Sequence, residues 1–350
     1  MNDDRPTRAV VVDDSQFMRT VISDILDTGG IDVVGEARHG RAALSAVETY
    51  EPDVVTMDVE MPEMDGLEAV DRIMAEQPTP ILMLSAHTGE DADVTFDALD
   101  RGAVDFFTKP GGEVSMEMVQ FEDQLVTKVE SVARSDVSTT GVAEGDGATT
   151  STPTRTLEEP ATIVIGSSTG GPRVVETVLA QLPSRSDLRI IVVQHMPKGF
   201  TGRFADRLDS TTDLTVTEAA EGDSIGPNQV AIAQGGAHLL IAADRNGVLD
   251  LELSEEPPVN GVRPAIDITM QSAANTIDEG LIGVVLTGMG RDGAAGVEAI
   301  DAAGGAVVVQ DEATSAVFGM PKRAIETGVV DAVLPVNDLA NGILETVIDQ

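Results

Sequence analysis

The sequence of 350 residues predicts an α/β protein built from two domains. Short β-branched runs alternate with amphipathic stretches on both sides of one low-complexity segment, a pattern typical of parallel sheets with crossover helices. The length also exceeds the roughly 100 to 200 residues of a usual domain. The segment 135–159 is rich in Ser, Thr, Gly and Asp, as flexible linkers are. We therefore expect domains over residues 7–130 and 160–348, joined by this linker.

The first domain is expected to contain five strands and five helices. Between the first two strands, apolar residues from Met18 to Leu26 fall at i, i+3, i+4, i+7 and i+8, so they form one helix face that closes at Gly29 and Gly30. A similar face marks the last helix at Met118, Phe121, Leu125 and Val129. The predicted strands are Ala9–Val12, Ile31–Val34, Val54–Met57, Ile81–Leu84 and Val104–Phe107.

The second domain shows the same alternation with an interruption. Residues 214–253 hold short apolar runs split by Gly, Pro and Asn, which predict antiparallel hairpins. These runs are Val230–Ala233, Leu239–Ala242 and Val248–Leu253. We expect a doubly wound α/β domain with an antiparallel hairpin insertion. Its regular elements are Thr162–Ile165, a helix after Pro172, Arg189–Val193, Ile266–Asn275, Ile282–Leu286, Ala294–Ala303 and Ala306–Gln310.

The charge balance excludes several classes of partner. With 22 basic and 60 acidic residues, the formal net charge is 22 − 60 = −38, which repels nucleic acid and anionic lipid. The acidity is spread evenly, since each side of position 134 carries −19 (10 − 29 and 12 − 31). Arginine outnumbers lysine 18 to 4. We interpret this surface as that of a halophile's protein; the alternative is an ordinary acidic protein that folds fully in dilute buffer.

Other features of composition indicate a soluble cytoplasmic protein. Cysteine is absent, which excludes disulfides, thiol nucleophiles and cysteine metal sites. The first residues, Met1 to Asp4, lack a basic and apolar signal sequence. No apolar run approaches the roughly 18 residues of a membrane span, so direct membrane insertion is not expected.

Polar residues follow the predicted strands of the first domain. Asp13 and Asp14 follow the first strand, Asp58 the third, Ser85 the fourth and Lys109 the fifth. Carboxyl ends of parallel strands meet at one sheet edge, so these side chains are expected to converge. Three carboxylates need a hard cation such as Mg²⁺. One of them can then attack a phosphoryl donor, while a hydroxyl and an ammonium bind the transferred oxygens. For any single acid, the alternative is a turn residue.

These positions resemble the response-regulator receiver domain, a flavodoxin-like (βα)5 fold, over about residues 7–130. The resemblance implies that Asp58 accepts phosphate from a sensor histidine kinase, that Asp13, Asp14 and Asp58 hold Mg²⁺, and that Ser85 and Lys109 act as the phosphate switch. It also implies a switch aromatic at Phe106 and a cis peptide before Pro110. The matching segments are DDS at 13–15, MDVEMPEMDG at 57–66, LSA at 84–86 and FFTKP at 106–110.

A glycine-rich turn opens the second domain. The sequence IGSSTGGP at 165–172 joins a strand to a helix whose first turn suits proline. The glycines match neither phosphate-binding pattern, GxGxxG or GK[ST], but Gly166-x-Ser168-x-Gly170 fits the nucleophile turn GxSxG. Ser167 and Thr169 are rival hydroxyls, and the spacing selects Ser168. A tight turn without chemistry is the alternative.

The candidate base is one of four histidines. His195 ends the strand after the Ser168 helix, and a βαβ unit places both residues on one sheet edge. His238 is the rival, at the start of a hairpin strand where a structural histidine is equally at home. His39 and His87 lie in the first domain.

The candidate acid lies in the turn that follows the third strand, residues 287–293. Asp292 in this turn can reach the same edge and stabilise an imidazolium. A backbone N–H of this turn, that of Met289, is the candidate oxyanion donor. Asp267 is the alternative acid, although its helical context suits a cap or a salt bridge better.

These residues resemble the catalytic domain of the CheB family of chemotaxis protein-glutamate methylesterases, over about residues 160–348. The resemblance implies that Ser168 is the nucleophile, His195 the base and Asp292 its partner, with no cofactor for the hydrolase. Two departures are Ser167, where alanine is usual, and Gln234, where proline is expected. The matching segments are IGSSTGGP at 165–172, QHMP at 194–197, RPAID at 263–267 and TGMGRDGA at 287–294.

The family implies a serine hydrolase that demethylates glutamate methyl esters, and deamidates glutamines, on methyl-accepting chemoreceptors. We expect the resting receiver to cover the Ser168 cleft and phosphate on Asp58 to shift that packing. Two alternatives come from other classes. A receiver-regulated adaptor that binds chemoreceptors without catalysis would tolerate Ser168→Ala, and a nucleotide-binding output would need a lysine in the glycine loop, which lacks one.

Overall fold

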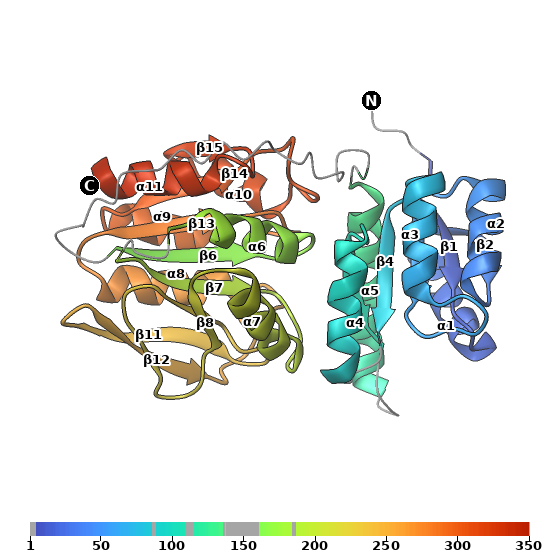
Figure 1. Cartoon of the computed structure of the whole chain (residues 1–350), viewed down its shortest axis with the longest axis horizontal. Helices are drawn as coiled ribbons and strands as arrows, with labels where there is room; N and C mark the ends of the chain where they lie inside the picture. The colour runs from blue at the N-terminus through green and yellow to red at the C-terminus, as the bar shows by residue number, and fades with distance from the viewer. Residues whose placement is uncertain are drawn as a thin grey trace. The chain divides into compact units, whose positions relative to one another are not determined.

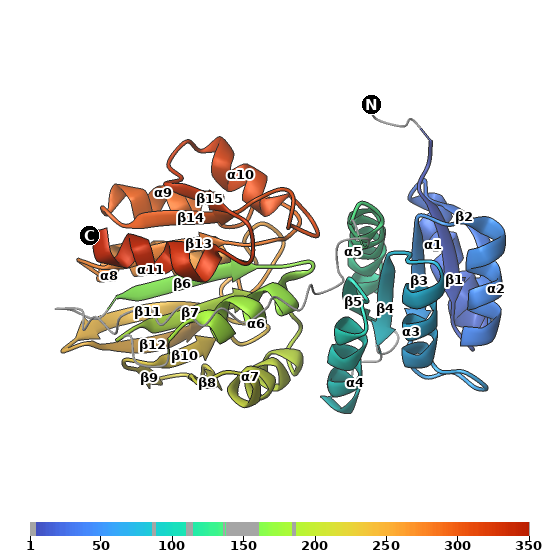
Figure 2. The same ribbon diagram turned by 45° about the horizontal axis from the view of Figure 1, so that its top comes forward.

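The computed structural model describes residues 5–85, 89–109, 115–135, 137, 161–183 and 187–349, and of residues 89–91, 115–120 and 347–349 only the backbone. The chain divides into two compact units, with the boundary between residues 146 and 147. Each unit has its own sheet and its own helices (Figures 1 and 2). Position 87 and the peptide bond before residue 110, both noted above, lie outside the described residues.

The first unit is a five-stranded parallel sheet with the order β2-β1-β3-β4-β5. This is the flavodoxin-like order, and it confirms the predicted five strands and five helices. The strands are β1 Arg8–Val12, β2 Asp32–Ala37, β3 Val54–Asp58, β4 Ile81–Ser85 and β5 Asp105–Thr108. The helices are α1 Gln16–Thr28, α2 Gly40–Tyr50, α3 Gly66–Glu76, α4 Gly89–Asp100 and α5 Ser115–Ala133.

Local sequence accounts for the ends of α1. Ser15 caps its first turn by accepting the N–H of Met18, as an N-cap hydroxyl does. The helix ends at Gly29, and Gly30 follows with φ of 83°, a conformation that favours glycine. The apolar face between these ends buries Ile22, Ile25 and Leu26. The apolar face of α1 therefore packs against the sheet before the chain continues into β2.

The second unit has a seven-stranded parallel sheet and a smaller antiparallel sheet. The larger sheet has the order β15-β14-β13-β6-β7-β10-β8, and the smaller has the order β11-β12-β9. The strands are β6 Thr162–Ser167, β7 Arg189–Gln194, β8 Thr215–Glu218, β9 Ser224–Ile225, β10 Gln229–Ile232, β11 His238–Arg245, β12 Val248–Ser254, β13 Leu281–Val285, β14 Ala306–Gln310 and β15 Ala332–Leu334. The helices are α6 Gly171–Gln181, α7 Phe200–Thr211, α8 Ile266–Thr276, α9 Ala294–Ala302, α10 Met320–Glu326 and α11 Leu339–Asp349.

One sequence-based prediction in this unit is wrong. The run Val230–Ala233 was expected in an antiparallel hairpin, but β10 lies in the main sheet, parallel to both β7 and β8. The Gly and Asn residues before it belong to a crossover, residues 219–228, that passes through β9 in the smaller sheet. The predicted hairpin exists only as β11 and β12, which pair antiparallel.

The order of the main sheet reverses beside β6. The chain moves from β6 to β7 on one side and later places β13 on the other. Such a reversal opens a crevice at the carboxyl ends of the two strands, where ligands of open α/β sheets bind. The turns after β6 and β13 are those that carry Ser168 and Asp292.

Candidate active site

The turn after β6 holds Ser168 at the carboxyl edge of the sheet. Gly170 adopts φ of 75°, and the N–H of Gly171 donates to the carbonyl of Ser168 over 2.8 Å. A Cβ on Gly171 would lie 2.2 Å from Oε1 of Gln194, so this turn needs glycine at both positions. Ser168 is buried, with 8% of its surface exposed.

His195 lies next to this turn because β6 and β7 pair in register. The N–H of His195 donates to the carbonyl of Ser167 over 3.0 Å. Gln194 ties the two segments together, since its Nε2 donates to the carbonyl of Ser168 over 2.8 Å. The hydroxyl of Ser167 donates to Oε1 of Gln194. The unusual serine beside Ser168 thus has its own partner and does not compete for the imidazole.

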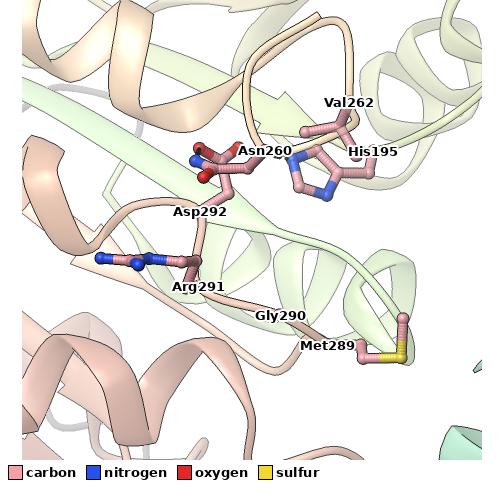
Figure 3. Close-up of a pocket in the computed structure, with 7 residues that line it drawn as sticks. All are labelled: His195, Asn260, Val262, Met289, Gly290, Arg291 and Asp292. Atoms are coloured by element: carbon pink, nitrogen blue, oxygen red, sulfur yellow. Dashed lines mark hydrogen bonds and ion pairs between the residues drawn. The ribbon is translucent and has the colours of Figure 1, made fainter.

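The structure brings His195 and Asp292 together. Nε2 of the imidazole lies 2.9 Å from Oδ2 of the carboxylate, and Figure 3 shows the ring facing Asp292. The imidazole Nδ1 is therefore the nitrogen available to accept a proton. Among the described residues, Ser168 Oγ makes no hydrogen bond to this ring. Catalytic hydrogen bonds are often long without substrate and tighten in the complex.

Asp292 sits at the N-terminus of α8. Its Oδ2 accepts the N–H of Ile266 over 2.7 Å, and its Oδ1 accepts the N–H of Asp267 over 3.1 Å. Burial by itself would raise the pKa of Asp292, but the hydrogen bond and charge of His195, with these two N–H groups, hold it below its usual value. The carboxylate is thus kept ionised beside the imidazole.

Asp267, the alternative acid, faces a different helix. Its Oδ1 accepts the N–H groups of Gly293 and Gly296, over 2.9 and 2.8 Å, at the start of α9. Burial and the neighbouring charge of Asp292 raise its pKa. The two aspartates therefore cap each other's helices: Asp292 caps α8, which carries Asp267, and Asp267 caps α9, which follows Asp292.

Asn260 joins the two carboxylates and was not singled out in the sequence. Its Nδ2 donates to Oδ2 of Asp267 over 2.8 Å and to Oδ1 of Asp292 over 3.1 Å, and it lies beside Asp292 in Figure 3. Asn260 and Gly261 have φ of 53° and 79°, and the flanking valines pair across them. The Asn-Gly dipeptide signals such a turn, but it does not reveal what the amide contacts.

The rival histidine has a structural environment. Nδ1 of His238 accepts the N–H of Ala265 over 3.1 Å, and Nε2 lies 3.2 Å from the carbonyl of Pro257. With both ring nitrogens engaged and 1% of its surface exposed, His238 supports the residue before α8. His39 of the first unit caps α2 through Nδ1, which accepts the N–H of Ala42 over 3.1 Å.

A pocket of about 250 Å³ opens beside the imidazole. The loop after β13 reaches Ser168, because Ser168 N–H donates to the carbonyl of Thr287 over 3.0 Å. A Cβ on Gly288 would lie 2.8 Å from Cβ of Ser168, so this approach depends on glycine. The pocket is lined by His195, Asn260, Val262, Met289, Gly290, Arg291 and Asp292 (Figure 3).

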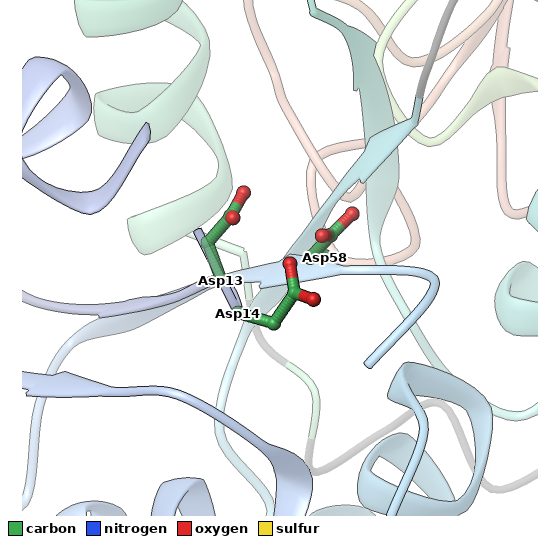
Figure 4. A group of neighbouring side chains, drawn as sticks. All are labelled: Asp13, Asp14 and Asp58. Atoms are coloured by element: carbon green, nitrogen blue, oxygen red, sulfur yellow. The ribbon is translucent and has the colours of Figure 1, made fainter. Parts of the chain in front are cut away.

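The first unit gathers an acidic site at its own sheet edge. Carboxylate oxygens of Asp13, Asp14 and Asp58 lie within 4.8 Å of one another (Figure 4). Nζ of Lys109 lies 2.7 Å from Oδ2 of Asp13 and 2.7 Å from Oδ1 of Asp58. Burial raises the pKa of Asp58 to about 6, against the opposing effect of Lys109. Such a cluster fits a divalent cation, because carboxylate oxygens are its preferred ligands.

Two further predicted residues flank this acidic site. Ser85 is buried at the end of β4, where its carbonyl accepts the N–H of Lys109 over 2.8 Å. Phe106 is buried on β5 and meets Phe96 of α4 edge to face, with ring centroids 6.2 Å apart. Ser85 and Lys109 are thus neighbours, and Phe106 is packed against a helix.

Together these features define the class of the protein: a receiver-type unit joined to an α/β unit with a hydrolase-like site. Residues 9–119 match the response regulator receiver domain, and residues 163–343 match CheB methylesterase. The chain belongs to the CheB methylesterase family.

Whole-chain relatives and a solved structure agree with this assignment. A protein of the halophilic archaeon Haloarcula marismortui, named protein-glutamate methylesterase/protein-glutamine glutaminase, is 57% identical and aligns over 97% of both chains. A Thermotoga maritima protein of the same name is 42% identical over 98% of this chain and 99% of its own. The crystal structure of the T. maritima CheB methylesterase catalytic domain matches with a TM-score of 0.52 and 44% identity, over 53% of this chain and 98% of that one. In the described part of the chain, no helix is long and apolar enough to span a membrane.

Proposed function

We propose that this protein hydrolyses glutamate methyl esters, and glutamine side-chain amides, on methyl-accepting chemoreceptors in the cytoplasm, and that phosphorylation of its receiver activates it. Family membership supports the reaction class. The observation that carries the assignment of the site is the 2.9 Å contact between His195 and Asp292 beside the Ser168 turn. Its position at the reversal of the sheet order fits a substrate site.

In the proposed reaction, Ser168 Oγ attacks the side-chain carbonyl of the ester, and His195 Nδ1 takes the hydroxyl proton. The tetrahedral intermediate collapses as His195 returns that proton to the leaving methoxide, releasing methanol, or to the leaving amide nitrogen, releasing ammonia. Water then attacks the acyl-enzyme with His195 again as base, and the product is a glutamate carboxylate. Asp292 stays ionised because its pKa is lowered, so it stabilises the imidazolium formed in each attack.

The oxyanion needs a donor close to the nucleophile. The loop after β13 lies against Ser168 through the Thr287 carbonyl, and Met289 lines the pocket beside His195. We assign the backbone N–H of Met289 to this role, since a fixed N–H aimed at the developing charge lowers the barrier. The assignment makes the glycines that flank Met289 part of the site.

In the receiver, Asp58 would accept the phosphoryl group from a sensor histidine kinase. Asp13, Asp14 and Asp58 would hold Mg²⁺, which when bound neutralises the phosphoryl oxygens. Lys109 already lies 2.7 Å from both Asp13 and Asp58 and would bind a transferred oxygen, as would the hydroxyl of Ser85. We assign Phe106 as the aromatic whose packing changes when Asp58 is phosphorylated. Phosphorylation is a local change of charge that favours one of two packing states.

The experiment is methanol release from methylated receptor fragments in molar KCl. Wild type should release methanol faster after treatment with a small phosphodonor and Mg²⁺. Ser168→Ala should lower the rate by about a thousandfold or more while its unfolding midpoint stays within a few degrees of wild type. Undiminished release by a folded Ser168→Ala variant would favour a non-enzymatic adaptor.

The regulatory part has its own control. Asp58→Asn should keep the basal rate and lose the response to the phosphodonor, because asparagine cannot carry the acyl phosphate. A variant that still responded would show that activation does not pass through Asp58.

A further inference from the structure

The basic residues of the catalytic unit divide into two groups. Of the 12 after position 134, two lie outside the described residues, which leaves 12 − 2 = 10. Six of these ten are engaged within the fold. Within the described residues, the side chains of the other four make no ion pair or hydrogen bond, and these are Arg173, Lys198, Arg291 and Lys322.

The engaged group is bound in ordinary ways. Arg189, Arg207, Arg245 and Arg323 form ion pairs with nearby acids. Arg263 donates to the carbonyls of residues 255 and 256, and Arg203 has its own partner. In a chain with 60 acidic residues, six of the ten described cations of this unit therefore have a partner and four do not.

Among the described residues of the catalytic unit, the four unpaired cations lie at the edge that holds Ser168. They follow four strands that are adjacent in the sheet order: Lys322 follows β14, Arg291 follows β13, Arg173 follows β6 and Lys198 follows β7. Arg291 lines the pocket beside His195 (Figure 3). Lys198 is exposed three residues after His195. We call these four residues the cationic rim.

The rim reverses the charge of its surroundings. The segments 168–174, 195–203 and 286–297, which follow β6, β7 and β13, contain three residues of the rim, the engaged Arg203 and one acid. That acid is Asp292, which is buried and paired with His195. After β14 the balance is mixed, since Asp311 accepts the N–H of Thr314 and Glu312 is exposed. The charge reversal is thus strongest around the Ser168 turn.

We propose that the cationic rim binds carboxylates that flank the esterified glutamate, so that the substrate is an acidic polypeptide segment. This inference rests on the proposed function and adds a specificity to it. The rest of the surface repels anions, so recognition of an acidic segment requires a local reversal of charge. In molar salt the Debye length is about 3 Å, and only contact pairs such as guanidinium to carboxylate persist. Each hydrolysis adds a carboxylate, which the same cations can hold.

The test compares two peptides that carry one glutamyl methyl ester, flanked either by glutamates or by serines. Methanol release is measured in molar KCl for wild type, for Lys198→Gln/Arg291→Gln and for a control, Arg72→Gln/Arg245→Gln, which makes the same charge change at exposed positions paired elsewhere. The quantity compared is the ratio of kcat/KM for the acidic peptide to that for the neutral one, which cancels differences in the amount of folded enzyme.

The rim variant should lower this ratio about tenfold, because each exposed ion pair that is lost contributes only a small factor, and the control should match wild type. An unchanged ratio in the rim variant would overturn the proposal while methanol release stayed dependent on Ser168. Stronger inhibition by RNA than by polyglutamate of equal charge would also overturn it, because the partner would then be of another class. Wild type that released no methanol from either peptide would instead refute the proposed function.

Discussion

At the scale of single residues, the site is organised around one amide that sequence patterns do not identify. Asn260 donates to both Asp267 and Asp292, two buried carboxylates that would otherwise repel each other. A shared donor lowers that repulsion and fixes the rotamer of Asp292, which in turn orients the imidazole. We therefore regard Asn260 as a positioning residue.

Replacing this amide should lower activity without removing a reacting group. Asn260→Ala is expected to reduce kcat/KM about ten- to hundredfold, the effect of losing hydrogen bonds to charged groups. It should also move the acidic limb of the pH profile upward, because the paired carboxylates attract a proton more strongly. Asn246→Ala is the matched control, since Asn246 and Gly247 have φ of 52° and 79° in a turn away from the pocket. A pH profile identical to wild type would assign Asn260 to the turn alone.

The contribution of Asp58 to the stability of the receiver is predicted to depend on pH. Asp58 has a folded pKa of about 6, above its ordinary value, so its contribution to stability is greatest below about pH 4 and is lost as pH rises through 6. At pH 8 without metal, ionised Asp58 costs up to about 3 kcal/mol. Asp58→Asn in EDTA should therefore raise the unfolding midpoint of the receiver at pH 8, by calorimetry, and the gain should shrink towards pH 4.

The matched control for this stability effect is Asp24→Asn. Asp24 is exposed on α1, and the substitution makes the same change in net charge. Equal midpoint shifts in the two variants would mean that overall charge, and not the burial of Asp58, sets the effect.

Several residue assignments were open in the sequence for a physical reason. Spacing places a side chain on a sheet edge, but it does not say which atoms meet there. His195 follows a strand and His238 begins one, so their positions in the sequence do not distinguish them. The contacts of the two rings do: His238 contacts Ala265 and Pro257, whereas His195 faces Asp292. For Asp267 the sequence indicated a cap or a salt bridge, and the helix that it caps is α9, which lies later in the chain.

At the scale of elements, the loop after β13 is held against the Ser168 turn by close backbone approach. Gly288 accommodates this approach, and the N–H groups of Gly319 and Met320 donate to its carbonyl over 3.1 and 2.7 Å. A methyl group at this position would lie 2.5 Å from Sδ of Met320 and 2.8 Å from Cβ of Ser168. The start of α10, the Ser168 turn and the loop after β13 therefore all pack closely around Gly288.

A methyl group placed there should damage the site more than the fold. Gly288→Ala is expected to lower the esterase kcat/KM at least about tenfold and to destabilise the unit by about 1 to 3 kcal/mol, as overpacking does. Gly226→Ala is the control, because a Cβ there meets nothing closer than 3.7 Å. The two variants would be compared by methanol release and by thermal unfolding. Equal activity in both would show that the loop can move aside.

Elements were predicted well where periodicity and chain order agree. The five strands of the receiver and the strands β6, β7, β13 and β14 lie where apolar runs predicted them. The prediction was wrong for β10 because Gly, Pro and Asn before a strand are found both in antiparallel hairpins and in crossovers to a parallel strand. The helices α7 and α11 were not predicted. The short elements α10 and β15 were not predicted either, since seven and three residues carry too little periodicity.

At the scale of the whole molecule, the dominant property is the charge of −38. The low-complexity segment 135–159 predicted two domains, and the structure divides the chain at this segment. Our boundaries of 7–130 and 160–348 remain a prediction. Each unit carries its own excess of acid, so each has its own self-repulsion in dilute buffer.

This repulsion predicts salt-dependent folding. The unfolding midpoint should rise by several degrees or more from dilute buffer to molar KCl, because salt screens repulsion between exposed carboxylates. Sucrose at the same osmolality is the control, since it favours burial without screening charge. Equal midpoints in dilute buffer and in molar KCl would identify an ordinary acidic protein.

The reciprocal caps of Asp267 and Asp292 make the catalytic unit's chemistry inseparable from its architecture. Asp292 accepts the first N–H groups of α8 and so holds the start of this helix. A substitution there would expose unsatisfied helix N–H groups as well as remove the partner of His195. Variants at this position would therefore be depleted in cells by proteolysis in addition to being inactive. A substitution of Asp292 would then lower the amount of folded protein and the catalytic rate together.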